Sequence, residues 1–269
     1  MKSNLSPQQI ETYREDGFLV IEEFLSEHEL FTWRDAIDES VSQRVGSHTI
    51  SEPGGSQDTH YENVFVQCVN LWQSNTDMRS LVLDRRLGKL AADLTGARGM
   101  HLYHDHALIK QPWANSTNWH VDNPYDAFHS PNQIMLWIAI DEATIQNGCL
   151  YFLPGTHKTS RFETSNLEGL DKPDIGCLFR VYPEWATIEP AATPMKAGSC
   201  VFISGMIAHA AGPNMTNLPR RAMSLVFMPQ GATFNGRNTV MPDALVEKLK
   251  VGDVIEDDEV FPLLYSLPE

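Results

Sequence analysis

The 269-residue sequence has few Lys and Arg residues and lacks a long hydrophobic run. Each of these absences argues against a class of function. Lys and Arg number 20 against 35 Asp and Glu, which gives a net charge of −15 at pH 7. A protein of this charge repels polyanions, which argues against nucleic acid and anionic membrane surfaces as partners. The longest apolar stretch, residues 134–140, is the length of a strand and is too short to span a bilayer. Residues 1–17 are polar and lack the apolar core of a signal peptide.

Cysteine is also scarce, and its spacing favours buried thiols over disulfides or a zinc site. The 4 cysteines are Cys68, Cys149, Cys177 and Cys200, and no two of them form a Cys-x-x-Cys pair. This pattern matches neither a zinc site nor a disulfide framework. We therefore expect buried, reduced thiols in a cytoplasmic protein.

Signals for helices occupy the first third of the chain, and signals for strands dominate its middle. Ser6-Pro7-Gln8-Gln9 combines an N-cap serine, a proline at N1 and a glutamine at N3, which predicts a helix that ends at Gly17. A strand at 18–21, a helix from about 27 to 41 and a helix at 77–95 follow. Short strands at 133–140 and 149–153 flank Asn147-Gly148, which is a hairpin signal. A last helix is expected at 242–250.

This order of elements predicts a mainly β fold with helical buttresses. The expected core is a double-stranded β-helix, the jelly-roll that cupins also have, although the pattern alone leaves a generic β-sandwich open. We expect one domain over residues 1–269, with N-terminal helices at about 6–95, the jelly-roll core at about 100–230 and a tail at 231–269. Hydrophobic residues make up 42% of the sequence, enough for such a core.

One motif in this core pairs a histidine with a carboxylate. His120 and Asp122 stand two residues apart, so on a strand their side chains point to the same face. They could supply two ligands of the facial triad that holds Fe(II). A His-x-Asp pair alone is more often part of a surface strand, but His209 follows the apolar run 199–203 far downstream. His120, Asp122 and His209 are therefore the candidate iron ligands.

At these residues the chain resembles the phytanoyl-CoA dioxygenase family of Fe(II)- and 2-oxoglutarate-dependent oxygenases. The resemblance rests on the three candidate ligands, on Arg220 eleven residues after His209, and on the segment 147–158. It runs from about Leu5 to the C-terminus. It implies that Arg220 holds the far carboxylate of 2-oxoglutarate. It also implies that iron, 2-oxoglutarate and O₂ together hydroxylate a small-molecule substrate, with release of succinate and CO₂.

The resemblance implies further residues around the cosubstrate. Lys110 precedes a proline-containing turn near 2-oxoglutarate, and Trp137 lies on a strand that often carries a wall of its pocket. Arg221 would face the opposite side of its strand from Arg220. Asp122 favours hydroxylation, because the related halogenases lack this carboxylate. The chain departs from many relatives at Ala211, where they carry a hydroxyl residue that contacts the cosubstrate.

Two histidines offer an alternative metal site. In the stretch 101–112, His104 and His106 alternate onto the same face as Lys110. They could be ligands themselves, as in a cupin-type metal enzyme. They could also line the interior as substrate contacts or as hydrogen-bond partners of the ligands.

Other hypotheses concern the class of protein and its substrate. A non-catalytic binding protein of the same fold and an acyl-CoA hydroxylase both remain open, although the net acidity favours a small metabolite over an acyl-CoA. The sequence does not indicate an oligomeric state. The long irregular stretches 45–61 and 158–194 are predicted to cover the barrel mouth and to close over the iron when substrate binds.

Overall fold

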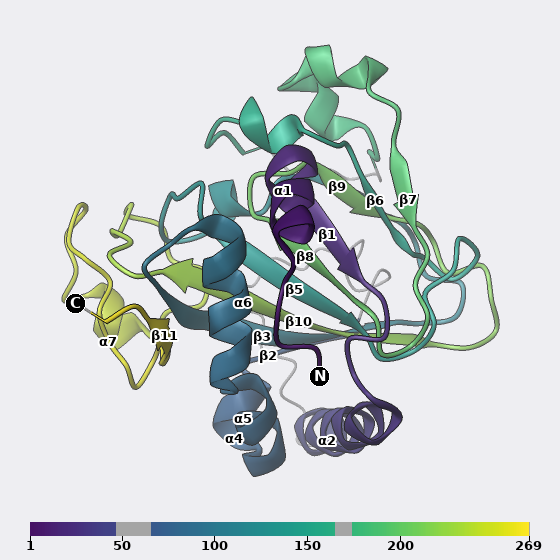
Figure 1. The fold of residues 1–269 in the computed structure, drawn as a ribbon, viewed down its shortest axis with the longest axis horizontal. Coiled ribbons are helices and arrows are strands. Elements are labelled where there is room, and N and C mark those ends of the chain that lie inside the picture. The colour runs from purple at the N-terminus through teal and green to yellow at the C-terminus, as the bar shows by residue number, and fades with distance from the viewer. Residues whose placement is uncertain (47–65, 165–173, 269) are drawn as a thin grey trace.

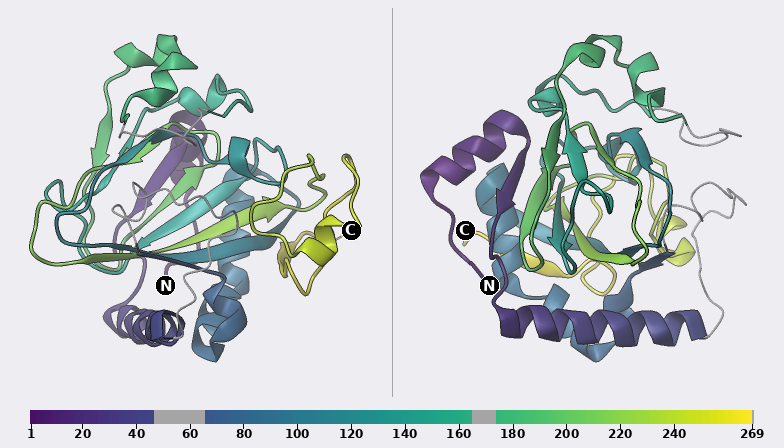
Figure 2. Two further views of the ribbon diagram at one scale, coloured as in Figure 1. Left: turned by 180° about the vertical axis from the view of Figure 1, so that it is seen from behind. Right: turned by 90° about the vertical axis from the view of Figure 1, so that its right-hand side faces the viewer.

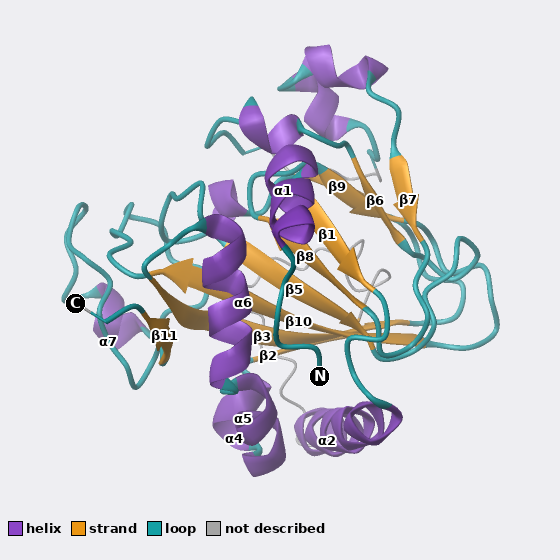
Figure 3. Cartoon of the chain, in the orientation of Figure 1, coloured by secondary structure: helices purple, strands orange, loops and turns teal. Residues whose placement is uncertain are grey.

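The computed structural model describes residues 1–46, 66–164 and 174–268. Its strands form two antiparallel sheets, and helices α2, α4, α5 and α6 pack on the outer side of the larger one (Figures 1 and 2). Figure 3 shows the strands gathered at the centre and the helices at the periphery. The predicted jelly-roll core with helical buttresses is therefore confirmed.

The larger sheet has 7 strands in the order β1-β8-β5-β10-β3-β11, with β2 also paired to β3. Its strands are β1 (Phe18–Ile21), β2 (Val66–Val69), β3 (Gly99–Lys110), β5 (Ile134–Ala139), β8 (Cys200–Ser204), β10 (Arg220–Pro229) and β11 (Leu263–Ser266). The smaller sheet has the order β4-β9-β6-β7. Its strands are β4 (Thr117–His120), β6 (Leu150–Phe152), β7 (Ala191–Thr193) and β9 (His209–Ala211).

The larger sheet is buried on both faces, and strand alternation separates two apolar clusters. On β5, Ile134, Leu136 and Ile138 pack in the cluster shared with the helices. Met135 and Trp137, the alternate residues, belong to the cluster between the two sheets. Because successive strand residues point to opposite faces, the interior that faces the smaller sheet is built from every second residue.

The described helices are α1 (Pro7–Asp16), α2 (Glu27–Gly46), α4 (Leu71–Ser74), α5 (Thr76–Val82), α6 (Arg85–Thr95) and α7 (Asp243–Val246). Side-chain caps begin several of these helices, among them α1, α5 and α6. The Ser6 capping box is confirmed, and Gly17 ends α1 with a φ of +85°. The single helix predicted at 77–95 is wrong, because the Asp84 carboxylate caps a new helix by accepting the Arg86 N–H. The helix predicted at 242–250 is confined to α7.

The Asn147-Gly148 turn does not close a hairpin, which corrects the prediction. The strands on either side of it, β5 and β6, lie in different sheets. The Asn147 side chain accepts the Thr144 N–H at 2.7 Å, and Gly148 has a φ of +92°. Such a side-chain-closed turn needs no strand pairing, so it can carry the chain from the larger sheet to the smaller one.

Short 3₁₀ segments and buried thiols complete the fold. The 3₁₀ segments are η1 (Asn123–Tyr125), η2 (Thr156–Lys158), η3 (Cys177–Arg180) and η4 (Pro183–Thr187). All four cysteines are free and buried, as predicted. Within the described ranges, every helix is too short or too polar to cross a membrane.

Asp105 joins the helical layer to the larger sheet. It lies on β3, is fully buried, and points away from the inner face that carries His104 and His106. Its two carboxylate oxygens accept the backbone N–H groups of Leu71 at 2.9 Å and Trp72 at 3.0 Å. These bonds fix the start of α4 against β3.

The stability contributed by Asp105 is expected to depend on pH. Burial raises its pKa to about 7, although the two N–H groups lower it, whereas an unfolded aspartate has a pKa of about 3.9. Between these values the folded state keeps a proton that the unfolded state has lost, so stability falls as pH rises and levels off above about 7. The Asp105→Asn variant cannot ionise. The difference in free energy of unfolding between the variant and the wild type should therefore change with pH. Between pH 5.5 and pH 7.5 it should shift by about 2 kcal/mol in favour of the variant. Urea denaturation at a series of pH values measures this, and parallel curves would contradict it.

Candidate metal and cosubstrate site

Strand pairing in the smaller sheet brings the three candidate ligands together. His120 ends β4, His209 begins β9, and the two residues are direct partners in the antiparallel pairing. Asp122 follows β4 at the start of η1. Its carboxylate lies 3.3 Å from His120 Nε2 and 3.8 Å from His209 Nε2. One ligand atom from each residue lies within 4.8 Å of the other two, so a single metal ion could bind all three.

Backbone hydrogen bonds set the orientation of both imidazoles. His120 Nδ1 donates to the Asn118 carbonyl at 2.8 Å, and His209 Nδ1 donates to the Ile207 carbonyl at 3.2 Å. Since a carbonyl only accepts, both Nδ1 atoms carry the proton and both Nε2 lone pairs are directed at the Asp122 side. This arrangement is typical of histidines that bind a metal through Nε2.

The charge of the cluster also suits a divalent cation. Burial alone would raise the pKa of Asp122, but His209 and His120 hold it well below its usual value, so the carboxylate is anionic. Burial lowers the pKa of His209 to about 4. Among the described residues Asp122 Oδ2 is buried without a hydrogen-bond partner. Burial alone would lower the pKa of His120, but Asp122 raises it, and a metal ion bound at Nε2 would replace the proton there. The three residues would then offer two neutral nitrogens and one anionic oxygen, the donor set of the iron facial triad, so they fit Fe(II).

The cluster opens into a cavity of about 140 Å³ between the two sheets. Residues from both sheets line it, namely Gln67, His106, Leu108, Thr117, His120, Asp122, Met135, Trp137, Leu150, His209, Ala210, Ala211 and Arg220. Gln67, Thr117 and Met135 were not singled out in the sequence. No motif marks them, and they reach the cavity only through strand pairing.

Arg220 is a buried cation in the wall of this cavity. It is the first residue of β10, is 1% exposed, and its guanidinium carbon lies 5.1 Å from the centre of the Trp137 ring. Within the described ranges its Nε and Nη1 atoms have no hydrogen-bond partner. A buried charge without a partner is costly, so these donors point to an anionic ligand. The 2-oxoglutarate carboxylate implied for this position fits that requirement.

Arg221 lies on the opposite face of β10, as the strand alternation predicts. Its guanidinium donates to the carboxylates of Asp141 at 2.8 Å and Asp38 at 2.6 Å. Arg221 is therefore part of an ion-pair network on the helix side of the sheet, away from the cavity.

Lys110 pairs with Arg220 across β3 and β10 and is fully buried. Its amine donates to the carbonyls of Asn115 at 2.7 Å and Gly212 at 2.9 Å. It thus ties two loops together beside Arg220. A direct contact between Lys110 and 2-oxoglutarate stays a prediction.

His104 and His106 lie on the inner face of β3, with ring centroids 5.2 Å apart. His106 lines the cavity. Burial lowers the pKa of His104 to about 3 and that of His106 to about 4, so both are neutral. In the described parts of the chain, the residues that could hold a metal are His120, Asp122 and His209, without this pair. The geometry therefore does not support the cupin-type alternative.

The stretches 45–61 and 158–194 are predicted to cover the barrel mouth, and part of the second one packs against residues beside the site. Residues 47–61 of the first stretch and 165–173 of the second lie outside the described residues. Further along the second stretch, Tyr182 and Trp185 stack with centroids 3.7 Å apart. They pack in one cluster with Val121 and Ala208, which adjoin the metal-ligand candidates. These residues form a wall next to the ligands, and closure on substrate binding stays a prediction.

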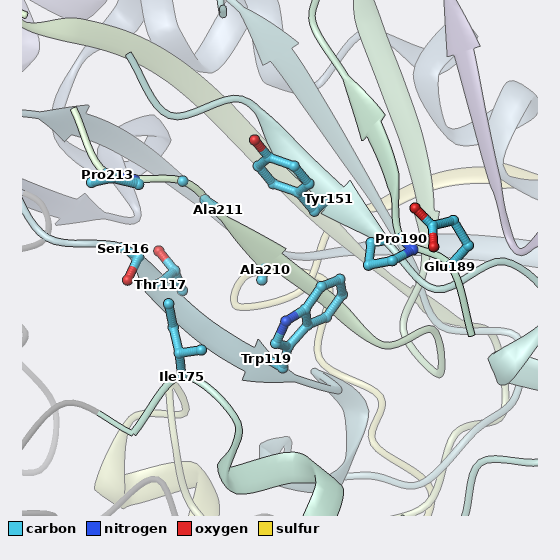
Figure 4. Close-up of a pocket in the computed structure, with 11 residues that line it drawn as sticks. Ser116, Thr117, Trp119, Tyr151, Ile175, Glu189, Pro190, Ala210, Ala211 and Pro213 are labelled. Atoms are coloured by element: carbon cyan, nitrogen blue, oxygen red, sulfur yellow. The ribbon is translucent and has the colours of Figure 1, made fainter. Parts of the chain in front are cut away.

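A larger hollow of about 430 Å³ lies along β4, β6 and β9 of the smaller sheet. Figure 4 shows Trp119, Tyr151 and Ala210 along it. Thr117, Ala210 and Ala211 line both this groove and the inner cavity, so the two hollows adjoin at β4 and β9. The candidate metal ligands line the inner cavity and do not line the groove, so the chemistry is assigned to the inner cavity.

The sequence is similar to a known protein family and to characterised relatives. The family model described as phytanoyl-CoA dioxygenase matches residues 13–222. A methylphosphonate hydroxylase of Gimesia maris is 28% identical over 232 residues, which cover 84% of this chain and 82% of that protein.

Two solved structures are also similar. The α-ketoglutarate-dependent carbocyclase SnoK from nogalamycin biosynthesis superposes with a TM-score of 0.76 at 27% identity, over 98% of both chains. The epimerase SnoN in complex with Fe³⁺, α-ketoglutarate and nogalamycin RO gives a TM-score of 0.71 at 22% identity, over 96% of this chain and 98% of that one. At this lower identity the likeness to SnoN concerns the fold.

Proposed function

The chain belongs to the phytanoyl-CoA dioxygenase family, and from that premise we propose that it hydroxylates a small organic molecule with Fe(II), 2-oxoglutarate and O₂. The observation that carries this proposal is the convergence of His120, Asp122 and His209 within 4.8 Å in the cavity that also holds Arg220. A non-catalytic binding protein would not need an open ligand set and a cosubstrate cation in the same cavity.

Each residue of the site has a distinct role in this proposal. His120, Asp122 and His209 would hold the iron, and the carbonyls of Asn118 and Ile207 keep both imidazoles in the tautomer that can bind it. Arg220 would pair with the far carboxylate of 2-oxoglutarate, and Trp137 would flank it. Iron and 2-oxoglutarate supply the oxidising power for oxygen insertion, with release of succinate and CO₂. The apolar walls of the cavity keep water away from the reacting carbon.

The net charge of the chain favours a small substrate over an acyl-CoA, because a charge of −15 repels the phosphates of coenzyme A. Among the relatives, the methylphosphonate hydroxylase is named for a small substrate. We also propose a cytoplasmic location, which the four free buried thiols support.

Succinate release tests the proposed function. Purified protein supplied with Fe(II), 2-oxoglutarate and O₂ should form succinate faster when a small organic substrate is added, and a metal chelator should stop the reaction. Short-chain acids and their acyl-CoA thioesters should be compared directly. Faster turnover of the thioester would overturn the small-substrate assignment. Absence of succinate with every compound would overturn the proposed function.

A further inference from the structure

One wall of the cavity carries polar groups that neither the metal site nor the cosubstrate site uses. Gln67 on β2 and His106 on β3 line it. The two strands are antiparallel, with Gln67 opposite Leu108 and Val69 opposite His106. Gln67 and His106 are therefore diagonal neighbours on one face, within reach of the same bound group. The iron ligands come from the other sheet, β4 and β9, so this wall lies across the cavity from them.

The register of the larger sheet separates this wall from the cosubstrate end. Arg220 pairs with Lys110, whereas His106 pairs with Ser224 four residues further along the strand. His104 pairs with Val226 beyond that. A cosubstrate carboxylate on Arg220 therefore leaves the His106 region free for a second molecule.

Several polar atoms in this region lack partners. Within the described residues His106 Nε2, His104 Nδ1 and Ser224 Oγ are buried and have no hydrogen-bond partner. His104 is 9% exposed and Ser224 is fully buried. Buried polar atoms in folded proteins are almost always paired, so a group of unpaired ones beside a cavity indicates a polar ligand.

The chemistry of the wall selects the class of ligand. Of the described residues that line the cavity, Arg220 is the one lysine or arginine, and the cosubstrate carboxylate would pair with it. An imidazole, an amide and a hydroxyl are neutral and offer both donors and acceptors, which suits a hydroxyl or amide group. Phosphonates and phosphates are instead usually bound by arginine clusters. The net charge of −15 adds to the cost of binding a dianion.

We propose that Gln67 and His106 determine substrate specificity by binding a neutral hydroxyl or amide group of the substrate. This inference rests on the proposed function and adds the class of substrate. It also predicts a class of substrate that differs from the one for which the methylphosphonate hydroxylase is named.

A matched set of ligands tests the inference directly. Butanol, butyramide, butyrate and butylphosphonate share one carbon skeleton and differ in the polar group. Saturation-transfer NMR on protein loaded with redox-inert Zn(II) and 2-oxoglutarate measures their binding without turnover. Butanol or butyramide should bind more tightly than butylphosphonate. His106→Phe and Gln67→Met should each weaken binding of the neutral ligand about tenfold, the effect of one lost hydrogen bond.

Two controls keep the outcomes distinct. His28→Phe changes an exposed histidine on α2 and should leave binding unchanged. The affinity for 2-oxoglutarate should be the same in all variants, which shows that the cavity is intact. Tighter binding of butylphosphonate, no binding of either neutral ligand, or unchanged neutral binding in both variants would overturn the inference alone. Failure of the wild type to bind 2-oxoglutarate would overturn the proposed function, and the inference with it.

Discussion

Replacing His209 with alanine is expected to abolish Fe(II) binding and turnover while leaving the fold intact. The variant keeps only His120 and Asp122 from a set whose ligand atoms lie within 4.8 Å of one another. Loss of a residue that merely supports a ligand already weakens metal affinity by about 10–100-fold, so loss of a ligand should have a larger effect. Iron per chain after gel filtration and far-UV circular dichroism measure the two parts of this result.

The matched control for this variant is His28→Ala, which removes an exposed histidine far along the chain from the site. It should retain the iron content of the wild type. If the His209→Ala protein also retained that iron content, the ligand assignment would be wrong.

Replacing Arg220 with alanine is expected to raise the dissociation constant of 2-oxoglutarate at least about a hundredfold. Arg220 is 1% exposed and lines the cavity, and among the described residues its Nε and Nη1 atoms have no hydrogen-bond partner. Breaking a buried ion pair by removing one partner costs about 3–5 kcal/mol, and each 1.4 kcal/mol is a factor of ten. Arg220→Lys should recover only part of the loss, because lysine cannot form the bidentate pair. Titration calorimetry with an inert metal in the site gives the affinities.

Arg221→Ala is the control for this experiment, since the neighbouring arginine points to the helix side and pairs with Asp141 and Asp38. It should lower stability without changing cosubstrate affinity. A change below threefold in Arg220→Ala would instead assign the carboxylate to Lys110.

The candidate metal and cosubstrate residues could be chosen from the sequence because most of their signals are local. His120 and Asp122 are two residues apart, and alternation on β10 separates Arg220 from Arg221 without any knowledge of the rest of the fold. His209 is a candidate because it follows the apolar run 199–203, and the resemblance to the family gives a role to Arg220, eleven residues after it. In the structure the β4–β9 pairing then places His120 opposite His209.

Features that depend on long-range pairing could not be predicted in this way. Gln67 enters the cavity because β2 pairs with β3, about 40 residues further along the chain. The Asn147-Gly148 turn has the local sequence of a hairpin, but its flanking strands pair with other partners in separate sheets. The break between α5 and α6 lies within a run of helix-forming residues. There the Asp84 side chain either caps a new helix or lets the first helix continue, and the local sequence does not decide between the two.

An anaerobic absorption titration tests the central claim most directly. Purified protein is titrated first with Fe(II) and then with 2-oxoglutarate, and the visible spectrum is recorded at each step. The structure predicts a weak charge-transfer band that appears only when both are present, is absent in His209→Ala and needs far more 2-oxoglutarate in Arg220→Ala. No band in the wild type, or an unchanged band in His209→Ala, would contradict the assignment of His120, Asp122 and His209 as the iron site.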